Sequence, residues 1–243
     1  MEYLKRSGEV FEDPVEDIKD QRIEDLRRPI QEVILQLKDK IDKGEYDYIV
    51  GDDASGRVPV LVFSTFLKKV YEEKGFDLPQ TFFFAGGTPT DVSVRDWKLS
   101  EIKSTVGDFL ESRPRSSSDN RVLLMTDYVL HGNSLKTLCD ALKELEIKYD
   151  IATLAASFDN NSDDLEKMLG AQIYEGGIND VPSIYNRPDL AGVVKRSNDK
   201  KIFSSPIGNE EQSKINSARK DANALAEQIF KWYKTTRQSP RVK

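Results

Sequence analysis

Short apolar runs alternate with helical patterns between residues 46 and 175, and this alternation constrains the fold more than any other feature. The strongest run, Val-Leu-Leu-Met at 122–125, is of the kind that is buried in a parallel sheet. Four more strands are expected at 46–51, 81–85, 151–158 and 171–174, with helices between them. We therefore predict an α/β fold with a doubly wound, mostly parallel sheet.

The first 45 residues are expected to form an irregular arm followed by a helical segment, and the predicted core covers 46–175. Apolar residues from Ile23 to Ile41 follow the three-and-four spacing of one helix face. Pro29 interrupts that face. Proline is tolerated in the first turn of a helix but breaks or kinks a helix when it lies in the interior. Either a short helix precedes a longer one that begins near Pro29, or a single helix kinks there.

Residues 176–243 are expected to form an irregular hood and then a C-terminal helix. The stretch from 175 to 207 contains several glycines and prolines and has no regular period, which is typical of a covering loop or lid. The helix is predicted from an apolar face that runs from Ile215 to Tyr233, with Asn209 as its N-cap. Trp232 and Tyr233 are expected to pack within the protein or against a second copy.

Composition excludes several kinds of chemistry. A single cysteine, Cys139, excludes an internal disulfide, and a single histidine, His131, excludes a histidine cluster, so oxygens must hold any metal. The net charge of -6 makes a nucleic-acid partner unlikely, since such partners favour basic surfaces. No apolar run approaches the roughly 18 residues that cross a bilayer, and the first residues lack the apolar centre of a signal peptide. We expect a cytoplasmic protein without a membrane segment.

The polar segment after the run 122–125 is the more informative of two candidate ligand loops. Its candidate residues are Thr126, Asp127, His131, Gly132, Asn133 and Ser134. A helix N-terminus offers free backbone N–H groups, glycine allows close approach, and a serine hydroxyl adds a donor, which together make a phosphate cradle. Asp127 can accept hydrogen bonds from sugar hydroxyls. The segment predicts a sugar-phosphate site, in which His131 either donates to phosphate or is an exposed turn residue.

The second candidate loop follows the run at 46–51. Its residues are Asp52, Asp53, Ala54, Ser55, Gly56 and Arg57. The N–H groups of Ser55 and Gly56 beside the guanidinium of Arg57 would form a nest for phosphate or pyrophosphate. Asp52 and Asp53 could hold the inner waters of a Mg²⁺ ion. Because both loops follow strands, they belong at the same edge of the sheet, and they imply a ligand with phosphate at both ends.

Two motifs resemble those of a known family. VLLMTDYVLHGNSL resembles the phosphoribosyl-diphosphate (PRPP) motif of type I phosphoribosyltransferases, and IVGDDASGRVPVL is similar to their pyrophosphate loop. The resemblance implies a glycosyltransferase of the PRTase-like fold that uses Mg²⁺, bound mainly through its substrate. It also implies that Asp127 and Arg57 are catalytic, that pyrophosphate leaves as the phosphoribosyl group passes to a nucleobase-like acceptor, and that the chain can form a homodimer.

The resemblance departs from the family pattern at two places. Thr126 stands where the family has the first of two acidic residues, and Leu130 and His131 stand where it has hydroxyl residues. These departures favour an alternative, a non-catalytic protein of the same fold that senses PRPP or a nucleotide and regulates a partner. A third hypothesis is an interaction protein that retains only the fold.

The family's mobile loop corresponds here to Gly86–Trp97 or to Arg113–Asn120. The cations available to meet phosphate are Arg95, Arg113 and Arg115 in these two segments and Lys98 directly after the first. Three hood residues could meet an acceptor base or belong to a surface strap, namely Tyr185, Arg187 and Lys195. The acceptor itself is not predicted by the sequence.

Overall fold

A computed structural model describes residues 17–84, 99–108, 121–156, 162–178, 182–185, 187–197 and 202–238. Its centre is a sheet of five strands in the order β2-β1-β3-β4-β5, and every neighbouring pair is parallel. The strands are β1 (Tyr48–Asp52), β2 (Gln80–Phe84), β3 (Arg121–Val129), β4 (Lys148–Ala156) and β5 (Ile173–Ile178). The predicted α/β class and parallel sheet are confirmed.

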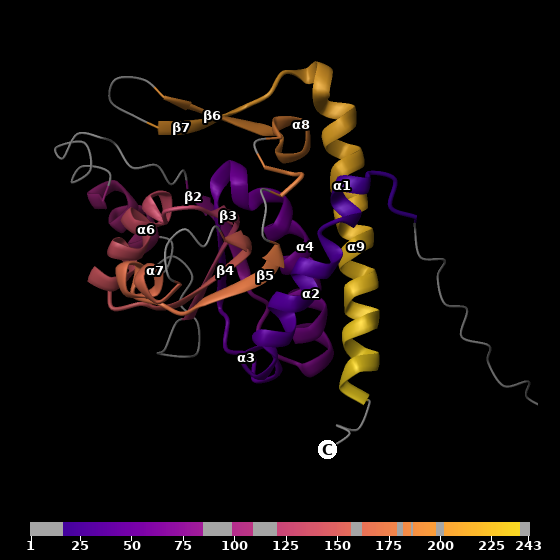
Figure 1. Ribbon diagram of the computed structural model, residues 1–243, viewed down its shortest axis with the longest axis horizontal. Coiled ribbons are helices and arrows are strands. Elements are labelled where there is room, and N and C mark those ends of the chain that lie inside the picture. Colours follow the sequence, from indigo (N-terminus) through magenta and orange to yellow (C-terminus); the bar gives the residue numbers. More distant parts are fainter. Residues whose placement is uncertain are drawn as a thin grey trace, which may run out of the picture.

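Helices cover both faces of the sheet, as a doubly wound α/β fold requires (Figure 1). One face packs against α2 (Arg27–Gln36) and α4 (Asp53–Lys74), and α9 (Gln212–Gln238) packs on the outside of α4. The other packs against the helical residues 99–108, α6 (Asn133–Glu144) and α7 (Ser162–Leu169). Burial on both faces explains why the central strand contains an uninterrupted apolar run.

The N-terminal segment folds as the first of the two predicted alternatives. A short helix, α1 (Gln21–Glu24), precedes the longer α2, and a further break at Leu37 separates α2 from α3 (Lys38–Asp42). Pro29 is the third residue of α2, where its missing N–H group removes no intrahelical hydrogen bond. The expected arm before residue 17 lies outside the described residues.

The expected polar loop after β1 is wrong. Helix α4 begins at Asp53 and not at Pro59, so Asp53–Arg57 are the first turns of the helix. Pro59 therefore lies inside α4, where its ring removes one backbone hydrogen bond. The helix continues because it is packed against α9, β1 and β3 (Figure 1), and this burial outweighs the local preference of the sequence for a turn.

Strand β3 is longer than its apolar run. It continues to Val129, so Thr126 and Asp127 are strand residues and not the loop residues that were expected. Hydrogen-bonded pairing explains the extension, since Thr126 stands opposite Thr153 and Tyr128 opposite Ala155 on β4. Strand β5 also runs beyond the predicted end at residue 174.

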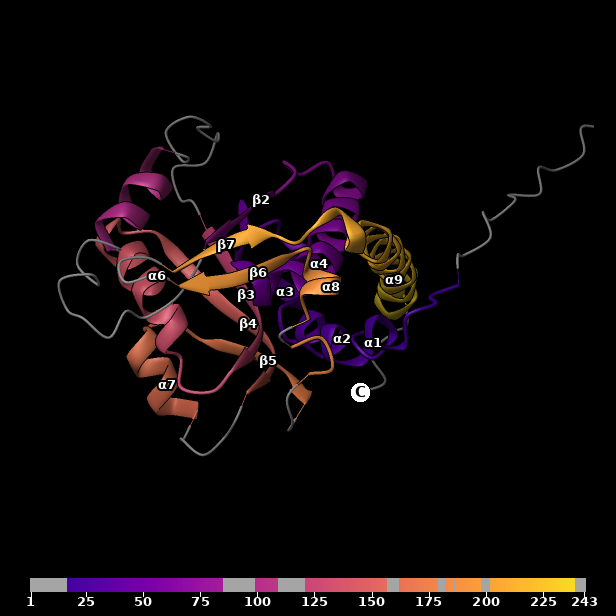
Figure 2. The same cartoon turned by 90° about the horizontal axis from the view of Figure 1, so that it is seen from above.

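The hood contains regular structure that the sequence did not reveal. It consists of α8 (Pro188–Ala191) and an antiparallel hairpin of β6 (Val193–Ser197) and β7 (Ile202–Pro206). Figures 1 and 2 show the hairpin lying across the edge of the sheet toward which the strands point. The hood is thereby placed above the carboxyl ends of the central strands.

The C-terminal helix α9 is confirmed, although its start differs from the prediction. A 3₁₀ turn, η1 (Asn209–Glu211), precedes α9, so Asn209 is not its N-cap. Tyr233 is buried against Phe66 with ring centroids 5.3 Å apart, and Trp232 packs against the same core, which confirms their packing role. No helix in the parts of the chain described above is long and apolar enough to cross a membrane.

Candidate functional site

The strand order locates the candidate site independently of any motif. After β1 the chain moves to β2 on one side, and it then returns to β3 on the other side of β1. In open parallel sheets, ligands bind beyond the carboxyl ends of the strands at such a switch point. Both predicted ligand segments, Asp52–Arg57 and Thr126–Ser134, begin at the carboxyl ends of the two strands that flank it.

Two helix N-termini face this edge of the sheet. Asp52 precedes α4 and Gly132 precedes α6, and neither residue caps its helix through a side chain. In contrast, the side chain of Asp20 does cap α1. The first backbone N–H groups of α4 and α6 carry the positive ends of two helix dipoles, which favours the binding of anions. The helical start of α4 therefore replaces the predicted nest. The N–H of Ser55 stays among the free donors of the first turn, whereas the N–H of Gly56, the fourth residue of the helix, lies where the intrahelical hydrogen bonds begin.

Two glycines shape these helix starts. Gly132 has φ +68°, and a Cβ there would lie 2.6 Å from Cε of Met168 on α7. Gly56 packs α4 onto the sheet, since a Cβ there would lie 2.7 Å from the carbonyl oxygen of Met125. Glycine at 56 lets the start of α4 approach β1 and β3 closely, and glycine at 132 fits the start of α6 against α7.

The predicted sugar-binding acid is deeply buried. Thr126 and Asp127 are each 1 % exposed, and Asp52 at the end of β1 is 3 % exposed. Met125 packs on the face that α4 covers and Val129 on the opposite face, and Asp127 lies between them near the carboxyl end of β3. The structure thus brings Asp52, Asp127 and the start of α4 to one place, but a ligand can reach Asp127 only after a covering group moves.

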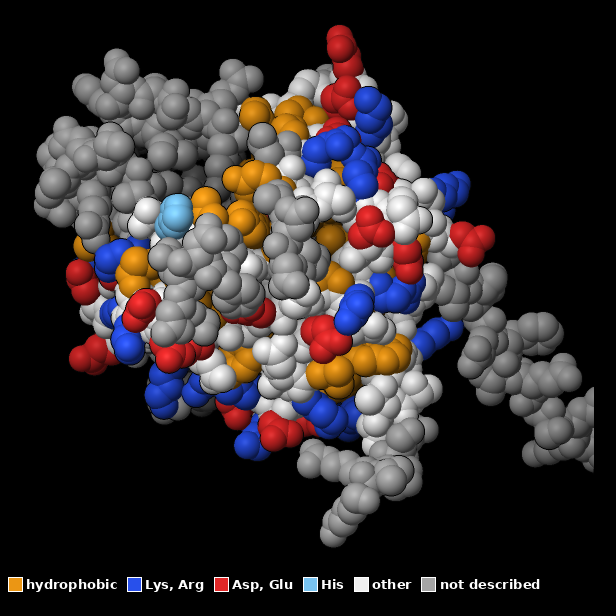
Figure 3. All heavy atoms as spheres, viewed as in Figure 1, with side chains coloured by type: hydrophobic (Ala, Val, Ile, Leu, Met, Phe, Trp, Pro, Cys, Tyr) orange, Lys and Arg blue, Asp and Glu red, His pale blue; other side chains and the backbone are white. Residues whose placement is uncertain are grey.

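The remaining residues at the start of α6 lie at the surface. His131 is exposed beside the exposed Leu130, and Figure 3 shows this histidine on the face that carries the hood. Asn133 is exposed and Ser134 is half-buried. His131 and Asn133 are therefore open to solvent, whereas Gly132 is buried, and the exposed position of His131 agrees with either of its two predicted roles.

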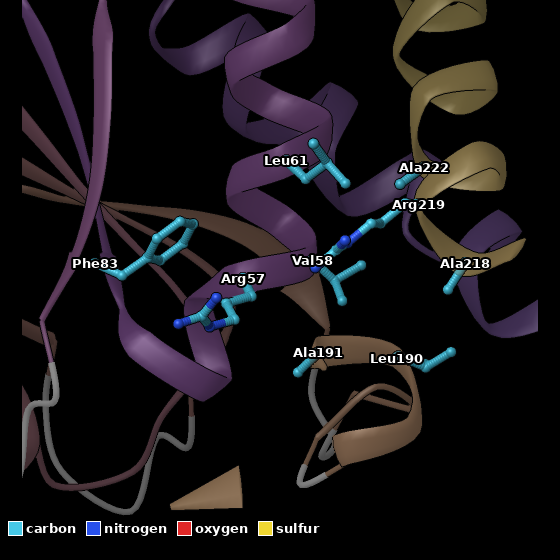
Figure 4. A pocket seen from close by; sticks show the side chains of 9 residues that line it. All are labelled: Arg57, Val58, Leu61, Phe83, Leu190, Ala191, Ala218, Arg219 and Ala222. Carbon is cyan, nitrogen blue, oxygen red and sulfur yellow. The ribbon is translucent and has the colours of Figure 1, made fainter. Parts of the chain in front are cut away.

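The side chain of Arg57 packs against an aromatic ring of β2. Its guanidinium lies over the ring of Phe83, 4.8 Å from the ring centre, and Figure 4 shows it directed toward β2. Phe83 fits there because Gly51 has no side chain; a Cβ on Gly51 would lie 2.5 Å from the ring. The predicted catalytic role of Arg57 therefore requires its side chain to leave this ring.

An aromatic contact joins the hood to the candidate site. Tyr185 of the hood meets Tyr128 of β3 edge to face, with ring centroids 5.8 Å apart. Tyr185 is 46 % exposed, so one side of this pair remains free for an additional flat group. The neighbouring Arg187 is engaged in an ion pair with Asp189 at 3.0 Å. The sequence suggested Tyr185 as a candidate but gave no signal for Tyr128, which reads as an ordinary strand residue.

Several predicted contributors lie outside the described residues. These are both candidate mobile loops with Arg95, Arg113 and Arg115, the neighbouring Lys98, and the side chains of Asp53, Ser55 and Lys195. Among the described residues, no group of three or more His, Cys, Asp or Glu side chains could hold a metal ion. A Mg²⁺ ion that is held mainly by ligand phosphates needs only one or two protein carboxylates, which Asp52 could supply.

Cys139 was expected in the core, and this is confirmed. It is fully buried on the apolar face of α6, and burial raises the pKa of its thiol to about 12 despite a hydrogen bond with Tyr149. Because only the thiolate is a strong nucleophile, Cys139 is chemically inert in the folded protein. It takes no part in the candidate site.

Neither a comparison with models of known protein families nor one with curated proteins found a match. The functional interpretation therefore depends on the geometry of the switch point and on the resemblance of the two motifs.

Proposed function

We propose that this protein is PRTase-like and binds PRPP or a related nucleotide with Mg²⁺ at the edge between β1 and β3. The observation that carries the proposal is the convergence of both motif segments on the topological switch point, with two helix N-termini directed at it. A ligand with phosphate groups at both ends matches two such N-termini. A sugar between them would meet the carboxylate of Asp127.

In the proposed reaction, the phosphoribosyl group passes to a nucleobase-like acceptor. The bond between the anomeric carbon and pyrophosphate breaks, pyrophosphate leaves with the electron pair, and an acceptor nitrogen forms the new bond and loses its proton. The N–H groups at the start of α4, with Arg57 turned away from Phe83, would stabilise the leaving pyrophosphate. The start of α6 would hold the 5-phosphate, and Asp127 would orient the ribose hydroxyls. Bound Mg²⁺ would supply positive charge to the pyrophosphate.

Three observations favour the second candidate, a PRPP or nucleotide sensor that does not turn over its ligand. Thr126 replaces an acid, Asp127 is covered, and Arg57 is held on Phe83. A protein with these features can keep phosphate affinity in its helix N-termini while lacking the groups that accelerate the reaction. Binding without turnover would distinguish it from the transferase.

The test is a calorimetric titration of PRPP with Mg²⁺ into the wild-type protein and into Asp127→Asn. We expect saturable binding that is at least about tenfold weaker in the variant, because a hydrogen bond to a charged group contributes about 1.5–3 kcal/mol. Asp77→Asn is the matched control, since Asp77 is exposed and precedes β2 at the opposite edge of the sheet. It should bind PRPP as the wild type does.

Ribose 5-phosphate should bind more weakly than PRPP, because it lacks the pyrophosphate that the start of α4 would hold. No saturable binding of PRPP, or equal binding by wild type and Asp127→Asn, would overturn the proposal. If PRPP binds, incubation with nucleobases separates the two candidates: release of pyrophosphate with formation of a nucleotide supports the transferase, and binding without release supports the sensor.

A further inference from the structure

A cavity of about 140 Å³ lies between α4, β2, α8 and α9, beside Arg57. We call it the arginine cavity. Its lining residues are Arg57, Val58, Leu61, Phe83, Leu190, Ala191, Ala218, Arg219 and Ala222 (Figure 4). None of the predicted sites included Leu190, Ala191 or Arg219, and the cavity appears only when four elements distant in the sequence are packed together.

The walls of the arginine cavity are apolar. Val58 and Leu61 come from α4, Leu190 and Ala191 from α8, and Ala218 and Ala222 from α9, while the ring of Phe83 closes the side toward β2. A cavity of about 150 Å³ with similar walls holds one benzene molecule in another protein. The volume and the walls therefore fit a single six-membered ring.

Two cations and no acid line the cavity. Arg219 reaches from α9 toward α4 (Figure 4), and its Nη2 would lie 3.6 Å from a Cβ built on Gly192, where α8 ends. Within the described parts of the chain, Arg219 forms no ion pair. The acid nearest in sequence to Leu190 is Asp189, which is engaged with Arg22 at 3.1 Å and with Arg187 at 3.0 Å. A negatively charged group in the cavity would be attracted to the guanidinium of Arg219.

We propose that the arginine cavity binds a small monocyclic aromatic or heteroaromatic carboxylate, with the ring between Leu61, Phe83 and Leu190 and the carboxylate at Arg219. Arginine suits a carboxylate because its planar guanidinium can donate two parallel hydrogen bonds. This inference goes beyond the proposed function, since the cavity needs no phosphate at the sheet edge to be occupied. Arg57 adjoins both places, so an occupant would also hold Arg57 near Phe83.

The test uses 4-fluorobenzoate as the probe, observed by fluorine NMR with the full chain. We expect saturable binding to the wild type, with 4-fluorobenzamide at least about tenfold weaker because it lacks the charge that Arg219 recognises. Acetate should not displace the probe, since it lacks the ring. Binding of the benzamide as tightly as the benzoate would overturn the proposal.

Two variants locate the probe. Arg219→Met keeps the apolar part of an exposed side chain and should weaken 4-fluorobenzoate at least about tenfold, with PRPP binding unchanged. Ala191→Leu, at a partly exposed position of α8, should fill the cavity and abolish probe binding. Lys231→Met is the matched control: it removes a positive charge from the same helix, roughly 18 Å further along.

The proposal predicts loss of binding in Arg219→Met and Ala191→Leu but not in Lys231→Met. Absence of saturable binding by the wild type, or wild-type affinity in both cavity variants, would overturn it. Its failure is separate from that of the proposed function, because the PRPP titration reports on Asp127 and the probe reports on Arg219.

Discussion

Replacing Asp150 should destabilise the fold strongly, because its buried carboxylate joins several elements at the amino edge of the sheet. Asp150 is the third residue of β4 and has a side chain that is 6 % exposed. It accepts hydrogen bonds from the hydroxyl of Tyr46 at 2.9 Å, from Nζ of Lys40 at 2.7 Å and from Nη1 of Arg121 at 3.1 Å. These bonds connect β4 with α3, with the start of β3 and with the chain leading to β1.

The expected loss for Asp150→Ala follows from these partners. The side chains of Lys40 and Arg121 are 26 % and 25 % exposed, so both can regain hydration after the substitution. Tyr46 is 0 % exposed, and its unsatisfied hydroxyl alone costs about 1–3 kcal/mol. Removing one partner of a buried ion pair typically costs about 3–5 kcal/mol, and because both cations here can regain hydration we expect a loss at the lower end, about 3 kcal/mol. Asp150→Asn keeps an acceptor for Tyr46 and should cost about half as much.

Urea unfolding followed by circular dichroism measures this loss. In a parallel thermal unfolding experiment, the melting temperature should fall by about 10 °C, since about 1 kcal/mol corresponds to roughly 2–4 °C in a protein of this size. Asp39→Ala, at an exposed position of α3, is the control and should change the free energy of unfolding by less than about 0.5 kcal/mol. A loss below about 1 kcal/mol for Asp150→Ala would refute the reasoning.

Three further predictions concern other sites. Gly132→Ala should lower the free energy of unfolding by about 1–2 kcal/mol because of its positive φ, with little added by Met168, whose flexible side-chain end can move aside. Gly177→Ala, with φ +73° and open space, should cause a similar loss in urea unfolding. Burial raises the pKa of Asp42, but hydrogen bonds from Lys38, Lys74 and Tyr233 outweigh it and hold that pKa at about 2. Because this pKa is below the ordinary value of 3.8, the ionised carboxylate contributes about 2 kcal/mol to the free energy of unfolding above pH 4, and this contribution should be lost as the pH falls to 2. In Asp42→Asn, the free energy of unfolding should therefore depend less on pH in this range. Cys139 should resist thiol reagents at pH 8 in the native protein and react in urea; rapid native labelling would contradict its burial.

The sequence predicted the sheet because apolar runs report burial on both faces of a parallel strand. It failed at the start of α4, where Asp52, Ser55 and Gly56 read as a turn and Pro59 as the first helical residue. Gly56 serves instead to pack the helix against Met125, and such close packing leaves no local signal. Thr126 and Asp127 were assigned to a loop because they are polar, although pairing with β4 keeps them in the strand.

The hood was the least predictable part. Its hairpin strands have five residues each, and α8 has only four, so neither periodicity nor composition distinguishes them from a loop. The cavity beside Arg57 depends on contacts between Phe83, Leu190 and Arg219, which are far apart in the sequence. The candidate ligand segments were recognisable from short motifs, but the direction of Arg57 depends on Gly51, which admits the ring of Phe83.

A titration of the ¹⁵N-labelled protein with PRPP and Mg²⁺, followed by amide NMR, tests the proposed binding site most directly. We expect the largest shifts at the amides that open the two helices, Ala54–Gly56 of α4 and Asn133–Leu135 of α6, with little change around Arg121 at the opposite edge of the sheet. Saturable shifts confined to other regions, or no shifts at all, would contradict a phosphate site at the switch point between β1 and β3.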